Sequence, residues 1–224
     1  MRGAKACSGG MSRLDALVEG RDRVLIHQTK EWGEILLGFE STNKFELNDE
    51  SGNHLGRAAE EAAGIGQWFL RNLFGSCRKA TVHIYGATGE KVGRGEKPFR
   101  WFFHRMEAFD GDTRIGAIQR KWSWFHRVFA VENAAGQEVM ELKSPFFHPW
   151  TFTLSFQGTE AGVIRKKWAG LLKEWFTDAD VFGLEMRPHV PVEVRKLLLV
   201  ATFLVDFTCF ENNQGGGSAL DVMN

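Results

Sequence analysis

The chain has 224 residues, enough to bury a core as one domain or at most two small ones. Its 28 basic and 28 acidic side chains cancel, and the lack of a basic excess argues against a dedicated nucleic-acid-binding protein. The three cysteines stand far apart without a C-x-x-C pair, so they indicate neither a disulfide framework nor a zinc site.

Both ends of the chain are expected to be flexible tails. Residues 1–12 are rich in small residues and aperiodic, and residues 212–224 contain a Gly-Gly-Gly-Ser run. The first tail lacks the apolar stretch of a secretory signal, so secretion is not predicted. We therefore expect one folded domain over residues 13–211.

Between the tails, glycine-bearing turns recur between alternating segments. Residues 81–85 and 151–156 alternate apolar and polar side chains, as half-buried strands do. The turns that predict hairpins between such strands are Glu50-Ser51-Gly52, Thr88-Gly89, Asp110-Gly111-Asp112, Ala135-Gly136 and Gln157-Gly158.

Two internal similarities support a repetitive β architecture. Aromatic residues precede His104, His126 and His148, which are spaced by 22 residues (126 − 104 = 22; 148 − 126 = 22). That interval fits two strands, a turn and a loop, so equivalent loops should leave the same end of the sheet. Residues 116–122 and 162–168 resemble each other at an interval of 46 (162 − 116 = 46). Many related hairpins predict an all-β, closed or nearly closed antiparallel barrel.

The end of the chain predicts one helix instead of strands. Alternation stops at Val190, where the helix is predicted to begin with Pro191 in an early position that tolerates proline, and residues 197–210 are apolar on every side except at Asp206. A helix of that kind must be buried, in protein or in lipid. Fourteen residues at 1.5 Å each make about 21 Å, short of the roughly 30 Å hydrocarbon core, so burial inside the barrel is favoured over a membrane span. The side chains expected inside are Leu197, Leu198, Phe203, Asp206 and Phe207.

The sequence contains no motif of a known catalytic site. A G-x-S-x-G elbow, an H-E-x-x-H pair and a Walker A loop are all absent, so an enzyme is not predicted. His104, His126 and His148 could hold a metal if their loops converge, but a repeated structural unit repeats its histidine without any metal.

An acidic turn and a basic run leave alternatives open. Asp178 and Asp180 could bind calcium weakly, but they occupy only the first and third positions of a twelve-residue loop that ends at His189, so an ordinary β-turn is the alternative. No other cofactor is expected. The run Arg165, Lys166 and Lys167 fits a nuclear import signal, a contact with anionic lipid or a solvated sheet edge.

Several segments together resemble the phospholipid scramblase family, from about Leu14 to Glu211. They are Leu25-Ile26-His27-Gln28, Gly38-Phe39-Glu40, Asn43-Lys44-Phe45-Glu46, Ala58-Ala59-Glu60, Lys167-Trp168-Ala169-Gly170, Phe176-Thr177-Asp178-Ala179-Asp180, Phe182-Gly183 and Asp206-Phe207-Thr208-Cys209-Phe210-Glu211.

The resemblance implies a tubby-like fold, a closed antiparallel β-barrel of about twelve strands around a C-terminal hydrophobic helix. It also implies calcium-promoted, ATP-independent, bidirectional movement of phospholipids between leaflets, at the cytoplasmic side of a membrane. The family's calcium segment falls on Asp178 to His189, whose twelfth position lacks a carboxylate here. The alternatives are a peripheral module that binds anionic phospholipids without moving them, and a nuclear or transcription-linked adaptor.

One departure from the family concerns membrane attachment. Animal members carry cysteines that accept palmitate where this chain has residues 67–70 and 99–104, which are rich in aromatics. An aromatic rim could replace the acylated cysteines as the contact with membrane phospholipids, preferably anionic ones. The alternative is that each aromatic pair splits between core and surface. The predicted contact residues are Phe102, Phe103, Arg105, Trp124, Phe125, Arg127, Phe146 and Phe147.

Overall fold

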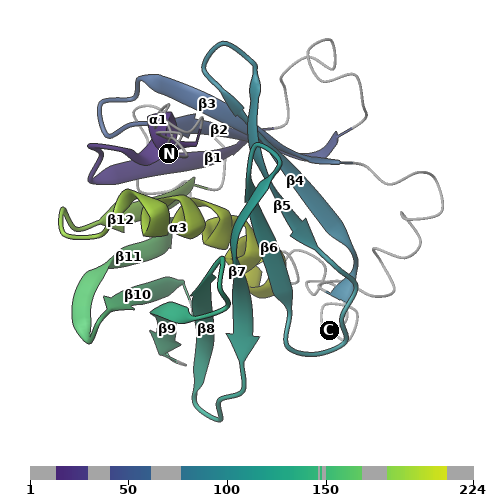
Figure 1. Ribbon diagram of the computed structural model, residues 1–224, viewed down its shortest axis with the longest axis vertical. Helices are drawn as coiled ribbons and strands as arrows, with labels where there is room; N and C mark the ends of the chain where they lie inside the picture. The colour runs from purple at the N-terminus through teal and green to yellow at the C-terminus, as the bar shows by residue number, and fades with distance from the viewer. Residues whose placement is uncertain are drawn as a thin grey trace, which may run out of the picture.

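A computed structural model describes residues 14–29, 41–61, 77–145, 147, 150–167 and 181–210. Twelve strands form a closed antiparallel barrel in which each strand pairs with its neighbours in the sequence, and β1 pairs with β12 to close the ring (Figure 1). The predicted all-β barrel with one C-terminal helix is therefore confirmed.

The strands are β1 (Arg23–Thr29), β2 (Ser41–Asn48), β3 (His54–Glu61), β4 (Ala80–Gly86), β5 (Lys91–Lys97), β6 (Arg105–Asp110), β7 (Thr113–Lys121), β8 (His126–Asn133), β9 (Glu138–Pro145), β10 (Thr151–Phe156), β11 (Thr159–Lys167) and β12 (Val181–Met186). A short helix, α1 (Asp15–Val18), precedes the barrel, and the chain ends with α3 (Val192–Val205) and a π-helical turn, η4 (Asp206–Phe210).

The barrel has two unlike ends, because connections in an antiparallel meander leave alternately from opposite ends. We call one the turn end, where all five predicted glycine turns lie. Gly52, Gly89, Gly111, Gly136 and Gly158 each adopt a positive φ there, between 56° and 88°. We call the other the loop end, where residues 98–104 join β5 to β6 and residues 122–125 join β7 to β8. Predicted loops of the 22-residue repeat therefore leave from one end.

The 46-residue repeat has a physical cause in close backbone contact. A Cβ atom on Gly116 would collide with the carbonyl oxygen of Glu132, and one on Gly162 with that of Glu185. Both glycines sit inside strands, on β7 and β11, where an adjacent strand approaches too closely for any side chain.

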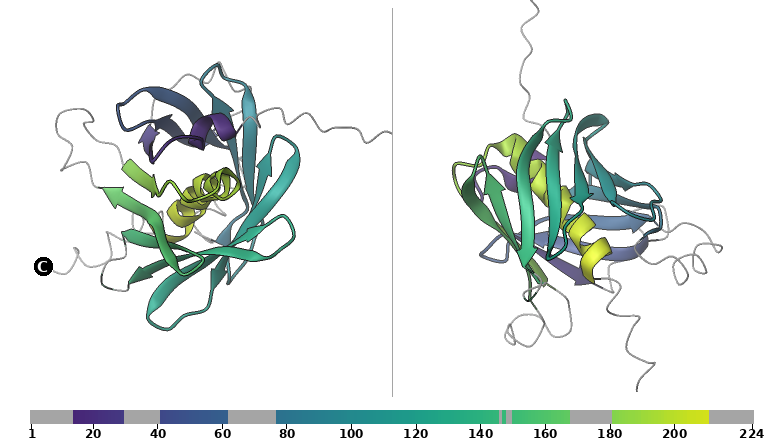
Figure 2. Two further views of the ribbon diagram at one scale, coloured as in Figure 1. Left: turned by 60° about the vertical axis from the view of Figure 1, so that its left-hand side comes forward. Right: turned by 90° about the horizontal axis from the view of Figure 1, so that it is seen from below.

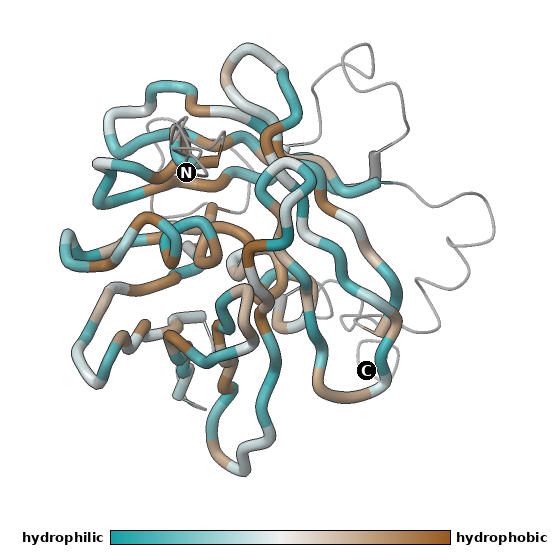
Figure 3. Tube along the Cα trace, in the orientation of Figure 1, coloured by the Kyte–Doolittle hydropathy of each residue, from teal (hydrophilic) through white to brown (hydrophobic). Residues whose placement is uncertain are grey.

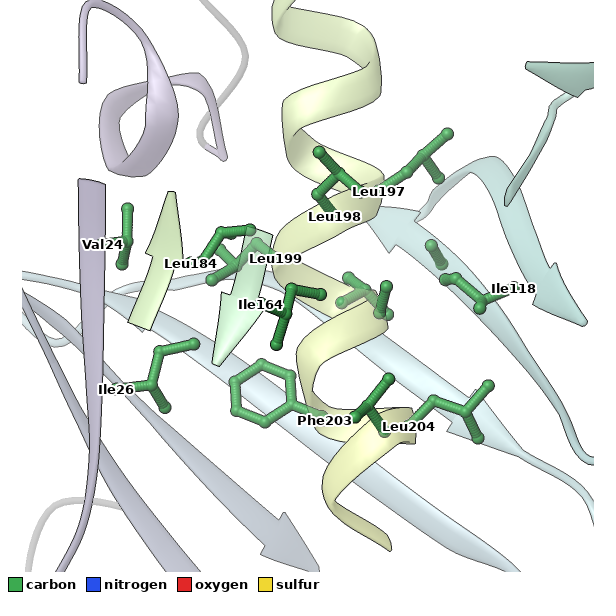
Figure 4. Close-up of a cluster of buried hydrophobic side chains, with 14 of the residues drawn as sticks. Val24, Ile26, Ile118, Ile164, Leu184, Leu197, Leu198, Leu199, Phe203 and Leu204 are labelled. Atoms are coloured by element: carbon green, nitrogen blue, oxygen red, sulfur yellow. The ribbon is translucent and has the colours of Figure 1, made fainter. Parts of the chain in front are cut away.

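The helix α3 runs through the barrel along its length, and its residues 197–205 are buried (Figure 2). Figure 3 shows hydrophobic residues in brown both on this helix and on the strands around it. Ile26 and Ile164 lie on one side of the helix and Ile118 on the other (Figure 4). The ring centroids of Phe203 and Phe45 lie 5.2 Å apart in an edge-to-face contact. The five side chains expected inside the barrel are all buried, Asp206 among them.

The helix begins earlier than the apolar run suggests. Pro191 precedes its first turn, where a missing N–H costs nothing. Arg195 and Lys196, which the sequence indicates as a charged flank, are buried. Lys196 Nζ lies 3.0 Å from Asp15 of α1 and 3.2 Å from Asp110 of β6, so the helix starts at the turn end and finishes at the loop end. Among the described residues, no helix has the length and apolarity needed to cross a bilayer.

Candidate functional site

Large hydrophobic side chains are exposed at the loop end of the barrel. Eight of them are exposed among the described residues, and all belong to connections at that end. We call this set the aromatic rim: Phe99, Trp101, Phe102, Phe103, Trp122, Trp124, Phe125 and Phe147. An apolar cluster of this size on one surface marks a place where a soluble domain meets another apolar phase or partner.

The predicted aromatic pairs do not split between core and surface. Phe102 and Phe103 are 77% and 48% exposed, and Trp124 and Phe125 are 82% and 74% exposed. Phe147 is 87% exposed, while Phe146 lies outside the described residues. In the two pairs that the structure describes, both rings therefore face outward.

Local contacts hold the rim loops in place. Phe103 adopts φ 51°, a conformation that bulky residues rarely take. Gln119 Nε2 donates a hydrogen bond to the Phe103 carbonyl oxygen at 2.7 Å, and the rings of Trp122 and Trp124 meet at 4.5 Å. The rings are thus presented by a tethered backbone. The aromatic pairs of the 22-residue repeat did not include Phe99, Trp101 and Trp122. These three side chains belong to the rim because the fold exposes them at the same end of the barrel.

The two arginines predicted beside the rim have different surroundings. Arg105 faces outward on β6 and forms ion pairs with Glu107 at 2.6 Å and Glu132 at 2.8 Å. The hydrogen bonds that it donates to Glu132 and Glu107 raise its pKa, so its charge is compensated on the barrel wall. Arg127 shares the inward face of β8 with Phe129, so its side chain starts from the inside of the barrel wall and not from its outside.

The basic run is not a continuous surface. Arg165 is exposed, but Lys166 is 6% exposed and its Nζ lies 5.0 Å from the centre of the Phe182 ring inside the barrel. The side chain of Lys167 is outside the described residues. Strand alternation therefore separates the charges that the sequence places side by side, and it weakens the import-signal and sheet-edge interpretations.

The predicted metal residues are not brought together in the described part of the chain. His104 is buried and His126 is exposed, while His148, Asp178 and Asp180 lie outside the described residues. Positions four to nine of the segment from Asp178 to His189 form β12. An extended strand of six residues spans about 20 Å, so this segment does not wrap around an ion as an EF-hand loop does.

A cavity opens between the two described rim loops. It measures about 250 Å³ and is lined by Trp101, Phe102, Phe103, His104, Arg120, Lys121, Trp122, Ser123 and His126. A larger hollow of about 460 Å³ lies on the outer wall near β11 and β12. Four of its charged residues form two ion pairs, Arg23–Glu185 at 3.2 Å and Arg187–Glu160 at 3.3 Å. The cavity at the rim thus combines apolar walls with basic groups.

His104 contributes a neutral imidazole to that cavity. Burial, followed by the charges of Lys97 and Arg120, lowers its pKa to about 4. The ring therefore carries no charge at neutral pH. Three other basic residues, Arg120, Lys121 and His126, line the same cavity. Burial also raises the pKa of the Cys209 thiol at the end of the helix, so it is not a reactive thiolate.

Comparison with known proteins assigns the chain to a family. The family model described as Scramblase matches residues 4–212. Phospholipid scramblase 2 of Bos taurus is 29% identical over 93% of this chain and 74% of its own length. Phospholipid scramblase 1 of Homo sapiens is 29% identical over 92% of this chain and 67% of its own length. A solved structure of an Arabidopsis thaliana protein covers 88% of this chain and 98% of its own, at 11% identity and a TM-score of 0.46.

Proposed function

Because the chain belongs to the scramblase family, we propose that it binds membrane phospholipids through the aromatic rim and moves them between leaflets without ATP. The observation that carries this proposal is the gathering of the exposed aromatic side chains at one end of the barrel. Phe and Trp favour the boundary between water and lipid, and basic groups nearby attract anionic head groups.

The rim would act as a peripheral anchor. Its rings come from loops on successive hairpins, so they can enter the lipid boundary together while the barrel wall stays in water. A preference for anionic lipids is supported by Arg100, which is exposed in one of these loops, and by Lys121 beside the other, which also forms an ion pair with Glu138 at 2.6 Å. We propose attachment to a cytoplasmic leaflet, since anionic lipids are concentrated there.

Vesicle binding tests the rim. The double variant Phe102→Ser with Trp124→Ser should co-sediment much less with phosphatidylserine vesicles, while its melting temperature stays close to that of the wild type. His189→Ser, which changes an exposed residue at the turn end, is the matched control and should bind normally. A large fall in melting temperature in the double variant would assign these rings to the core and contradict the proposal.

A lipid-flip assay separates movement from binding. Vesicles with a fluorescent head group are treated with a reductant that does not cross the bilayer, and the protein should expose inner-leaflet lipid to it. Binding without flipping would favour the alternative of a peripheral module that binds anionic phospholipids. The adaptor alternative has less support, since Lys166 is buried.

A further inference from the structure

A layer of charged side chains lines the inside of the barrel at the loop end. Side chains alternate along each strand, so residues two positions from a core residue share its inward face. Ala58, Ile118, Phe129 and Ile164 belong to the core. The next inward-facing residues toward the loop end are charged, and we call them the charged layer: Glu60, Arg78, Lys97, Arg120, Arg127 and Lys166.

Positive charge is in excess in this layer. Among the described residues, five of the six side chains in this layer are cationic and Glu60 is the acidic one, while Asp206 of η4 adds a second buried carboxylate at this end. Arg78 is compensated, because its guanidinium binds both oxygens of Glu60 and lies 5.5 Å from the Phe207 ring centre. Lys97 donates to the Arg78 carbonyl oxygen.

Arg120 and Arg127 differ from the ion-paired arginines of the outer wall. On the outer wall, Arg94 pairs with Glu96 at 2.6 Å and Arg114 pairs with Glu107 at 2.7 Å. Within the described residues, neither Arg120 nor Arg127 donates a side-chain hydrogen bond, and Nη1 of Arg127 is sealed from solvent without a partner. Both side chains are half-buried, so a guanidinium without a partner there has lost part of its hydration, and a bound anion would replace the lost interactions.

The two guanidinium groups face the same space. Arg120 is paired with Phe129 in the β7–β8 register, and Arg127 lies two positions from Phe129 on the same face of β8. Arg120 and Arg127 are therefore diagonal neighbours on the inward face. The positive charges of both arginines oppose the burial that raises the pKa of the Cys209 thiol, so both lie near the end of the helix. Arg120 and His104 also line the cavity beneath the rim, with Trp101 and Trp122 at its walls. The cavity thus reaches from the rim to Arg120, and Arg127 is the diagonal neighbour of Arg120 on the inward face.

We propose that Arg120 and Arg127, with His104 beside them, form a phosphate-binding site beneath the aromatic rim. The phosphate is that of a phospholipid head group, drawn below the rings while the acyl chains stay in the bilayer. A planar guanidinium group donates two parallel hydrogen bonds to two oxygens of one phosphate, whereas an ammonium group acts as a point charge. This inference rests on the proposed function, since it assumes that the rim meets phospholipid.

Soluble head groups test the site separately from the rim. Calorimetric titration with glycerophosphoserine should show binding to the wild type, at least tenfold weaker in Arg120→Gln and in Arg127→Gln. Arg187→Gln removes an exposed arginine at the turn end and should bind as the wild type does. The rim double variant should keep this soluble binding while losing vesicle binding, so failure of the rim and failure of the site are distinguishable.

Two further readouts exclude a merely structural role. Removal of an uncompensated charge should leave the melting temperatures of Arg120→Gln and Arg127→Gln equal to that of the wild type or higher. In the wild type, glycerophosphoserine should raise the pKa of His104 from about 4, measured by NMR. Arg120→Lys keeps the charge without the planar group and should recover binding only in part.

Several results would overturn the proposal. One is equally tight binding of glycerophosphoserine to Arg120→Gln, Arg127→Gln and Arg187→Gln. The others are a lower melting temperature of Arg120→Gln or Arg127→Gln with unchanged binding, and no binding of glycerophosphoserine to the wild type. Titration with inorganic phosphate distinguishes the source of the phosphate. Binding of inorganic phosphate that exceeds binding of glycerophosphoserine would indicate a site for free phosphate and contradict the lipid assignment.

Discussion

Lys196 is the buried charge that joins the helix to both α1 and the barrel wall. Its Nζ lies 2.7 Å from Glu193, 3.0 Å from Asp15 and 3.2 Å from Asp110. Burial alone would lower the pKa of Lys196, but the hydrogen bonds to Glu193, Asp15 and Asp110 outweigh it and raise the pKa. The ammonium therefore stays charged inside the protein and compensates two nearly buried carboxylates.

Lys196→Met should be strongly destabilising, because it leaves Asp15 and Asp110 without their shared cation. Loss of one partner of a buried ion pair costs about 3–5 kcal/mol, measurable as a fall in the free energy of unfolding in urea. The exposed partner provides the control, since Glu193→Gln should cost no more than about 1 kcal/mol. A Lys196→Met protein as stable as the wild type would show that the three carboxylates are hydrated.

His104 should make the fold sensitive to acid. Its pKa in the folded state is about 4, below its ordinary value of 6.5, so the unfolded chain binds its proton first as pH falls. Stability from neutral His104 is complete above pH 6.5 and declines as pH falls toward 4, by up to about 1.4 kcal/mol per pH unit. Lys97 and Arg120 face this ring and oppose its protonation.

Urea unfolding at pH 7.5 and pH 5 measures this effect. Carboxylates also titrate in this range, so the informative quantity is the difference between the wild type and His104→Gln, which carries no titrating ring. The variant should lose less stability than the wild type between the two pH values. An identical loss in both proteins would exclude His104 as the source.

Calcium should bind weakly at Asp178 and Asp180, if it binds at all. Two carboxylates without a bidentate twelfth ligand predict a dissociation constant at or beyond roughly 10⁻³ M. His189→Asp should leave the affinity unchanged, because β12 lies between that position and the two aspartates. Calorimetric titration that shows micromolar affinity, lost in Asp180→Ala, would contradict this prediction.

At the scale of elements, α3 shows what its sequence pattern could and could not predict. Its apolar stretch and its length, shorter than a bilayer, were enough to predict a helix inside the barrel. The start of the helix near Val190 was also predicted, but the burial of Arg195 and Lys196 was not, because charged side chains are usually exposed. Their partners, among them the Val190 carbonyl oxygen 2.8 Å from Arg195 Nε and the carboxylates around Lys196, exist only after the chain has folded.

Leu198→Asp should abolish the folded barrel, because this side chain is fully buried within it. An unpaired carboxylate there has no hydrogen-bond partner and replaces apolar packing, so the variant should show no cooperative thermal transition in detergent-free buffer. Leu198→Met, which nearly conserves volume, is the control and should cost less than about 1.5 kcal/mol. If Leu198→Asp stayed folded and lost only vesicle binding, the helix would be a membrane anchor.

At the scale of the whole molecule, the repeats predicted the topology and one end of the site. The 22-residue interval placed the aromatic loops at a common end, since two antiparallel strands return the chain to that end. The inward basic layer escaped prediction, because Lys97, Arg120 and Arg127 lie at strand ends where polar residues are ordinary. Only closure of the barrel shows that they face one another.

The position of α3 inside the barrel also determines when the protein can fold. Strands β1 and β12 close the ring by pairing Arg23 with Glu185, which are 162 residues apart (185 − 23 = 162), and the helix that fills the core follows both. Contacts between such distant residues make folding slow, on a scale of milliseconds to seconds. Until the ribosome has made residue 207, the inner faces of the strands lack their packing partner, so the growing chain exposes apolar surface that favours aggregation.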